Sequence, residues 1–206
     1  MLNNNSIDKS MDMDVKDRTL ILLALLVAGT FFMENLDSTI ITPAIPMIAH
    51  DFAVGPGDLN LAVSIYMLTL GIFIPISGWV ADRLGSRSVF TFAIALFTIS
   101  SLLCGTSQTV WQLIAFRVIQ GIGGAMMVPV GRLVVLRLTP KKSLVSVMAT
   151  LTWPGLVAPV LGPPLGGYLT DYSGWRWIFY LNVPLELIAC VVAIRLVPSV
   201  MLSKEY

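Results

Sequence analysis

The chain has 206 residues, of which 56% are hydrophobic and 12% are charged, and its formal net charge is +1. Its mean hydropathy is +0.82, whereas about a quarter of the residues in a soluble domain are charged. This composition excludes an ordinary soluble domain, and the small net charge argues against nucleic acid as a partner. Cys104 and Cys190 both lie in apolar stretches, so no disulfide framework or metal site is implied.

The first 18 residues are polar and mix basic residues with aspartates, so we expect a short disordered tail. The apolar segment that follows is too long for the core of a signal peptide. It also lacks a cleavage pattern of small residues, so it is predicted to be the first membrane span.

Long stretches without charge define the remaining spans, because about 20 apolar residues cross a bilayer as a helix. The stretch from Ser88 to Phe116 must hold two spans, since the polar residues 104–108 form a turn in its middle. The predicted fold is an all-α membrane protein with six transmembrane helices. They are expected at residues 19–48, 59–81, 88–106, 109–136, 143–170 and 177–197.

Basic residues predict the orientation. The N-terminal tail, residues 82–87, residues 132–142 and the C-terminal end fall on one side of the membrane. Most of the 13 basic residues lie on that side: Lys9, Lys16, Arg18, Arg83, Arg87, Arg132, Arg137, Lys141, Lys142, Arg195 and Lys204. By the positive-inside rule, both termini are cytoplasmic.

Two segments of the chain repeat one pattern. Residues 78–90 (GWVADRLGSRSVF) and 167–179 (GYLTDYSGWRWIF) both match G-x-x-x-D-x-x-G-x-R-x-x-F, with every fixed position displaced by 89. Three predicted spans separate the copies, so they face opposite sides of the membrane. The pattern predicts an inverted repeat of three plus three helices, 19–106 and 109–197, a construction typical of secondary transporters.

Charged residues also occur inside the predicted spans. Glu34 and Asp37 are three residues apart in the first span and therefore share one helix face. A charge at mid-membrane costs roughly 2.5–3.5 kcal/mol, so these groups rarely face lipid. Arg117 in the fourth span is predicted at about the same depth as Asp37, at 1.5 Å per residue, so a salt bridge or a water-mediated contact is feasible.

The functional hypothesis is that Asp37 and Glu34 take up and release protons while Arg117 tunes their ionisation. A nearby cation favours the ionised carboxylate and desolvation favours the neutral form, so closing the site to water switches protonation. A cationic substrate would then displace the proton. Two alternatives remain: Asp37 and Arg117 form a permanent structural pair, or Asp37 caps a helix that breaks near Pro43.

Glu186 is a carboxylate in the sixth span with no obvious partner. Three roles are open. It lines a central cavity, it bonds a neighbouring helix, or it satisfies backbone N–H groups freed near Pro184.

Four motifs resemble the major facilitator superfamily. GWVADRLGSRS (78–88) resembles its loop between helices two and three, G-x-L-A-D-R-x-G-R-K/R, with departures at Val80 and Ser86. FRVIQGIGGA (116–125) is similar to the fourth-helix motif, and LGPPLGG (161–167) to the fifth-helix G-P-x-x-G-G motif of antiporters. LDSTIITPAIP (36–46) resembles the first helix of the fourteen-helix drug:proton antiporters.

The resemblance gives the loop motif a gating role, in which it braces against the other half of a transporter and stabilises the outward-facing state. Ion pairs among Asp82, Arg83 and Arg87 are expected across a turn that Gly85 permits. The alternative is positive-inside anchoring and a tight turn. The motif residues are Gly78, Asp82, Arg83, Gly85 and Arg87.

The fifth-helix motif contains small residues that allow close helix contact and prolines that bend the helix. Helix packing alone explains these residues equally well, and only the resemblance ties them to export. The motif residues are Gly162, Pro163, Gly166 and Gly167.

The resemblance as a whole implies the N-terminal half of a proton-coupled antiporter that exports drugs or other small hydrophobic or cationic compounds. An enzyme is not expected, since G-x-S-x-G, H-E-x-x-H and P-loop motifs are absent from the sequence. No cofactor is expected, and a proton gradient supplies the energy.

The expected partners are the lipid bilayer, a small-molecule substrate, and a missing C-terminal half, a companion chain or a second copy. The expected location is the bacterial inner membrane, where the chain is a multi-pass protein whose cytoplasmic end, residues 198–206, is truncated. The alternative is a non-transporting fragment or an assembly partner of a companion half.

Overall fold

The computed structural model describes residues 4–196, with side chains from residue 19 onward except at Pro56. Helices account for all the regular structure in this part of the chain. They are α1 (Asn4–Ile40), η1 (Thr42–Ala44), α2 (Ile45–Phe52), α3 (Pro56–Leu84), α4 (Ser86–Thr106), α5 (Val110–Leu138), η2 (Lys141–Ser143), α6 (Leu144–Ser173), α7 (Trp177–Tyr180) and α8 (Asn182–Leu196).

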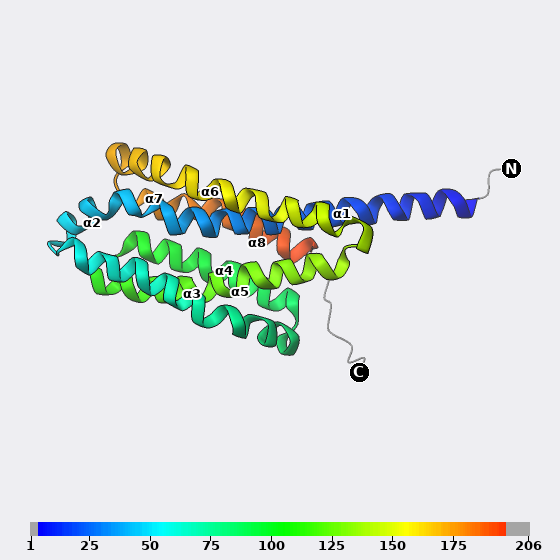
Figure 1. The fold of residues 1–206 in the computed structure, drawn as a ribbon, viewed down its shortest axis with the longest axis horizontal. Helices are drawn as coiled ribbons and strands as arrows, with labels where there is room; N and C mark the ends of the chain where they lie inside the picture. Colours follow the sequence, from blue (N-terminus) through cyan, green and yellow to red (C-terminus); the bar gives the residue numbers. More distant parts are fainter. Residues whose placement is uncertain (1–3, 197–206) are drawn as a thin grey trace.

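Six segments of the described chain are long and apolar enough to cross a membrane, which confirms the predicted all-α fold with six spans. They are Thr19–Phe52, Gly57–Leu84, Ser86–Thr106, Val110–Leu138, Lys141–Ser173 and Trp177–Leu196. Figure 1 shows them running side by side, with successive connections alternating between the two ends of the bundle. The most extensive contacts pair α1 with α6, and α5 with α3 and α4.

The first and last spans, predicted at 19–48 and 177–197, are each interrupted in the structure, and the break near Pro43 is one that the sequence had left open. α1 ends at Ile40, and α7 ends at Tyr180. Each break precedes a proline, Pro43 or Pro184. A proline lacks the backbone N–H and its ring clashes with the carbonyl four residues earlier, which disfavours a continuous helix at these points.

The N-terminal segment differs from the expectation as well. α1 begins at Asn4, so residues 4–18 are helical where a disordered tail was expected. The predicted cytoplasmic end, residues 198–206, lies outside the described residues.

The two copies of the repeated pattern make matching contacts. Gly85 and Gly174 both have positive φ, 87° and 91°, in the turns between spans. Arg87 donates to the carbonyl oxygen of Ile194 in the last turn of α8. Arg176 Nη2 donates to the carbonyl oxygen of Ser107, the residue after α4, at 3.3 Å. Each arginine thus binds the C-terminal end of the third span of the other three-helix repeat, as basic side chains do near helix C-termini. These contacts are those expected of an inverted repeat.

Candidate functional site

Asp37 is the centre of a buried polar cluster near the end of α1. Its side chain is 0% exposed. Arg117 Nη1 of α5 donates to Asp37 Oδ2 at 2.6 Å. Two amides donate to Oδ1: Gln120 Nε2 of α5 at 3.2 Å and Asn182 Nδ2 of α8 at 2.8 Å. The contact expected between Asp37 and Arg117 is therefore present as a direct ion pair. We call Asp37, Arg117, Gln120 and Asn182 the Asp37 cluster.

The cluster joins four helices. Asn182 also donates to Ser101 Oγ of α4 at 3.4 Å, so its amide connects Asp37 to that helix. Because every one of these hydrogen bonds depends on side chains from different helices, a change in the charge of Asp37 would alter the packing of α1 against α5 and α8. The alternative in which Asp37 caps a broken helix is not favoured, since its partners are side chains of other helices.

Arg117 is enclosed by aromatic rings. Its side chain is 1% exposed, and its guanidinium carbon lies 5.2 Å from the Tyr66 ring centre and 4.9 Å from that of Phe179. Nη1 also donates to Gln120 Oε1 at 3.2 Å, whereas Nε and Nη2 have no hydrogen-bond partner. The hydroxyl of Tyr66 is likewise buried without a partner. The cluster therefore contains polar atoms that are free to bond when its geometry changes.

Glu34 lies apart from this cluster, although it is on the same helix. It is 9% exposed, and no hydrogen bond or ion pair of its side chain occurs among the described residues. Arg117 pairs with Asp37 and not with Glu34, so the expectation that one arginine serves both carboxylates is not met by direct contact. Glu34 instead lines a cavity of about 490 Å³ between α1, α3 and α5, together with Arg132.

Arg132 was counted among the basic residues predicted on the cytoplasmic side, and no site role was expected for it. It lies within α5, and its guanidinium carbon is 4.3 Å from the ring centre of Phe31. Its Nε is buried without a hydrogen-bond partner. The helical spacing could have indicated a place near the site. Arg132 follows Arg117 by just over four turns of 3.6 residues, so the two residues lie on roughly the same side of α5.

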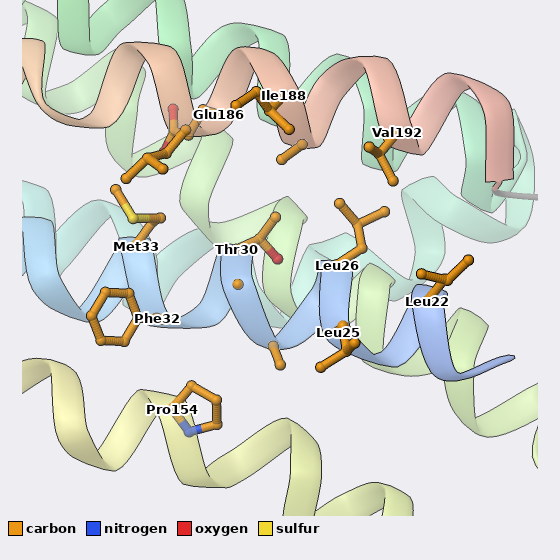
Figure 2. Close-up of a pocket in the computed structure, with 14 residues that line it drawn as sticks. Leu22, Leu25, Leu26, Thr30, Phe32, Met33, Pro154, Glu186, Ile188 and Val192 are labelled. Atoms are coloured by element: carbon orange, nitrogen blue, oxygen red, sulfur yellow. The ribbon is translucent and has the colours of Figure 1, made fainter. Parts of the chain in front are cut away.

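Glu186 on α8 combines two of the three expected roles. It is 1% exposed, and Thr98 Oγ1 of α4 donates to its Oε2 at 3.1 Å. Its Oε1 has no hydrogen-bond partner. Glu186 also lines a groove of about 600 Å³, shown in Figure 2.

This groove lies between α1, α6 and α8 and is almost wholly apolar. Figure 2 shows the α1 side chains of Leu22, Leu26 and Met33 facing α8, with Pro154 of α6 on the opposite side. Ile188 and Val192 supply the α8 wall. The groove offers shape and hydrophobic surface, and Glu186 is its one ionisable lining residue.

The charges of the loop motif do not pair with one another: Asp82 and Arg87 contact other helices, and Arg83 contacts an aromatic ring of its own helix, α3. Asp82 pairs with Arg137 Nη2 of α5 at 3.5 Å. Arg83 stacks on Trp79, at 4.4 Å from the ring centre, and Arg87 bonds α8 as described above. The expected ion pairs within the turn are therefore wrong. Neighbouring residues of a helix point in different directions, so Asp82 and Arg83 meet different partners.

The turn itself has the expected form, since Gly85 alone separates α3 from α4 and its φ of 87° favours glycine. A side chain at Gly78 would meet no atom within 4 Å, so this glycine faces open space.

The fifth-span motif lies where α6 packs on the end of α1. A Cβ atom at Gly162 would overlap Thr39, and one at Gly166 would overlap the carbonyl of Ile40. A Cβ atom at Gly167 would meet nothing within 4 Å, and Pro163 lies inside α6. Two of the three glycines therefore allow α6 to contact the helix that carries Asp37, within one turn of that residue.

Six apolar spans enclose charged side chains at the helix contacts inside the bundle, an arrangement typical of membrane transport proteins. Residues 27–203 match the model of the Major Facilitator Superfamily, which covers most of the chain. The chain belongs to this superfamily and is a multi-pass integral membrane protein.

Its curated relatives are longer. "Putative multidrug resistance protein MdtD" of Citrobacter koseri is 44% identical over 174 residues, which cover 84% of this chain and 37% of the relative. The protein of the same name in Yersinia enterocolitica is 45% identical over 174 residues, with the same coverage. The one in Shigella flexneri is 44% identical over 174 residues. The chain thus spans 37% of the length of the relatives it matches.

Proposed function

We propose that this chain supplies the six-helix N-terminal half of a proton-coupled antiporter that exports drugs or other small hydrophobic or cationic compounds. The membrane class follows from the family. Proton coupling and substrate class are inferred from the charged groups inside the bundle and from the names of the relatives. The proposed setting is the bacterial inner membrane with both termini in the cytoplasm, as the distribution of basic residues favours.

The observation that carries the proposal is the buried pair of Asp37 and Arg117, with a side-chain separation of 2.6 Å and exposures of 0% and 1%. An ion pair taken out of water is costly to form, and breaking it by removing one partner costs more still. A proton that binds to Asp37 would therefore change the free energy of the conformation in which the pair is formed.

Protonation of Asp37 would weaken its attraction to Arg117 and, on Oδ1, would replace the carboxylate acceptor of the Gln120 and Asn182 amides with a weaker hydroxyl acceptor. Because these partners lie on α5 and α8, their release would loosen α1 against both helices. The contact between α6 and α1 would also change, since Gly162 and Gly166 pack on the end of α1. Glu34, which faces a cavity and has no bonded partner among the described residues, provides a route by which a proton reaches this region.

The loop motif fits a gate in this scheme. Asp82 connects the turn between α3 and α4 to α5, and Arg87 connects it to α8, while Arg83 stacks on Trp79 of α3. We propose that this turn also braces against a second six-helix unit, which is a C-terminal half, a companion chain or a second copy. A proton gradient is the proposed energy source, with no cofactor.

Export by the intact chain tests the proposal. The purified chain is reconstituted in vesicles loaded with tetraphenylphosphonium, and efflux is followed after an inward proton gradient is imposed. Efflux should depend on the gradient and should be abolished in Asp37→Asn at unchanged expression. Asp171→Asn, an exposed carboxylate, is the matched control and should export normally.

Two results count against the proposal. Unchanged export by Asp37→Asn would remove Asp37 from proton coupling and favour the permanent structural pair. Folded wild-type chain that exports nothing would exclude a second copy as the other half and favour the alternative, a non-transporting fragment or an assembly partner of a companion half.

A further inference from the structure

The cavity between α1, α3 and α5 contains two opposite charges that are not bonded to each other. Glu34 and Arg132 both line its volume of about 490 Å³. Their side chains are not among the ion pairs of the described residues, which join groups within 4.0 Å. The volume falls in the range of about 300–1,000 Å³ that small-molecule sites occupy.

Both charged groups have unused bonding capacity. Glu34 is more than nine-tenths buried and accepts no hydrogen bond from the described residues. Arg132 Nε is buried with no partner. Buried polar groups are normally satisfied, so a buried Nε and a carboxylate that both lack a bonded partner and line one cavity call for a partner that the described residues do not provide.

The arginine is held in place by an aromatic ring. Phe31 lies under the guanidinium of Arg132, and it also fills the space beside Gly155 of α6, where a Cβ atom would overlap its ring. The ring is therefore fixed between α5 and α6. Val128, Pro129 and Ile74 complete an apolar wall. The guanidinium is thus positioned before any ligand arrives.

Charge decides the ligand class. A simple cation would be attracted by Glu34 and repelled by Arg132, and a simple anion would experience the reverse. A ligand that carries an ammonium and a carboxylate at opposite ends of an apolar body satisfies both. Charge-assisted hydrogen bonds are the strong ones, and a guanidinium binds carboxylates with two parallel donors.

We propose that the cavity between α1, α3 and α5 binds zwitterionic small molecules, with Glu34 holding the ammonium, Arg132 the carboxylate and Phe31 the apolar body. As an assignment of substrate class it rests on the proposed transport function, but binding itself needs no proton gradient and no second half. Binding can therefore fail while export of tetraphenylphosphonium succeeds, and the reverse.

Equilibrium binding of three matched probes to the intact purified chain in detergent tests the proposal. The probes are 4-(aminomethyl)benzoic acid, its methyl ester, which is a cation only, and its N-acetyl derivative, which is an anion only. The zwitterion should bind at least tenfold more tightly than either derivative. Glu34→Gln should abolish its advantage over the anion, and Arg132→Gln its advantage over the cation.

Control variants keep the result interpretable. Asp171→Asn and Arg195→Gln remove exposed charges that do not line the cavity, and all three affinities should stay at the wild-type values. Arg132→Lys keeps the charge and should retain part of the preference for the zwitterion, which identifies a charge effect in a folded protein. Leu136→Trp should fill the cavity and weaken all three probes.

The proposal is overturned if the ester or the N-acetyl derivative binds as tightly as the zwitterion. It is also overturned if none of the probes binds at millimolar concentration. If the zwitterion binds with equal affinity to the wild type and to the Glu34→Gln and Arg132→Gln variants, it binds outside this cavity and the proposal is wrong.

Discussion

Two charged regions share helix α1 but differ in how their charges are satisfied. Asp37 is fully buried and accepts bonds from Arg117, Gln120 and Asn182. Glu34, three residues earlier, faces a cavity with Arg132 and accepts none from the described residues. We therefore propose two distinct uses for a charge inside a membrane bundle. A satisfied charge holds helices together and makes their packing sensitive to protons, whereas an unsatisfied one is available to a ligand.

Removing the arginine from each region should give the largest contrast. Arg117→Ala leaves Asp37 as a buried charge without its counter-ion, and we expect the free energy of unfolding to fall by about 3–5 kcal/mol. Arg132→Ala removes a stacking contact with Phe31 and no ion pair, and the expected loss is about 1 kcal/mol. Chemical unfolding in detergent, followed by circular dichroism, measures both. Equal losses would contradict the distinction between the regions.

The packing of α6 on α1 should give an intermediate effect. Gly166→Ala places a methyl group against the carbonyl of Ile40, and we expect a loss of about 1–3 kcal/mol in the free energy of unfolding. Gly167→Ala is the matched control in the same motif and turn of helix. It meets no atom within 4 Å, so its effect should stay within about 0.5 kcal/mol. A similar loss at both positions would mean that the motif acts through helix bending and not through contact with α1.

The exposed pair in the loop should give the smallest effect on stability. The Asp82 and Arg137 side chains are 52% and 33% exposed. Asp82→Asn should therefore change the free energy of unfolding by only about 0.2–1 kcal/mol, and less at high salt. If the loop is a gate, the rate of export should nevertheless fall in this variant. Normal export would leave positive-inside anchoring and a tight turn as the role of the motif.

The sequence was sufficient for the features that a strong energetic rule controls. The six spans follow from apolar length, and the Asp37–Arg117 contact follows from the cost of charge in the membrane and the agreement of two depths. The place of Gln120 in the cluster could also have been predicted, because it lies three residues after Arg117 and so on the same side of α5.

Other parts of the site depend on tertiary packing and could not be predicted. Asn182 lies in the sixth span, and nothing local indicates that its amide reaches Asp37 in the first. The partners of Asp82 and Arg87 depend on which helix lies beside each side chain. The sequence treated Arg132 only as a basic residue near a helix end, and its contact with Phe31 and its place beside Glu34 in one cavity depend on how three helices pack.

The central claim is that a proton on Asp37 and a bound cationic substrate exclude each other. Proton release on binding tests it most directly. Tetraphenylphosphonium is added to the intact chain in weakly buffered detergent at acidic pH, and the pH is recorded. Wild-type chain and Asp171→Asn should release protons in proportion to the cation bound, and Asp37→Asn should bind it without release. Equal proton release by wild type and Asp37→Asn would contradict the account.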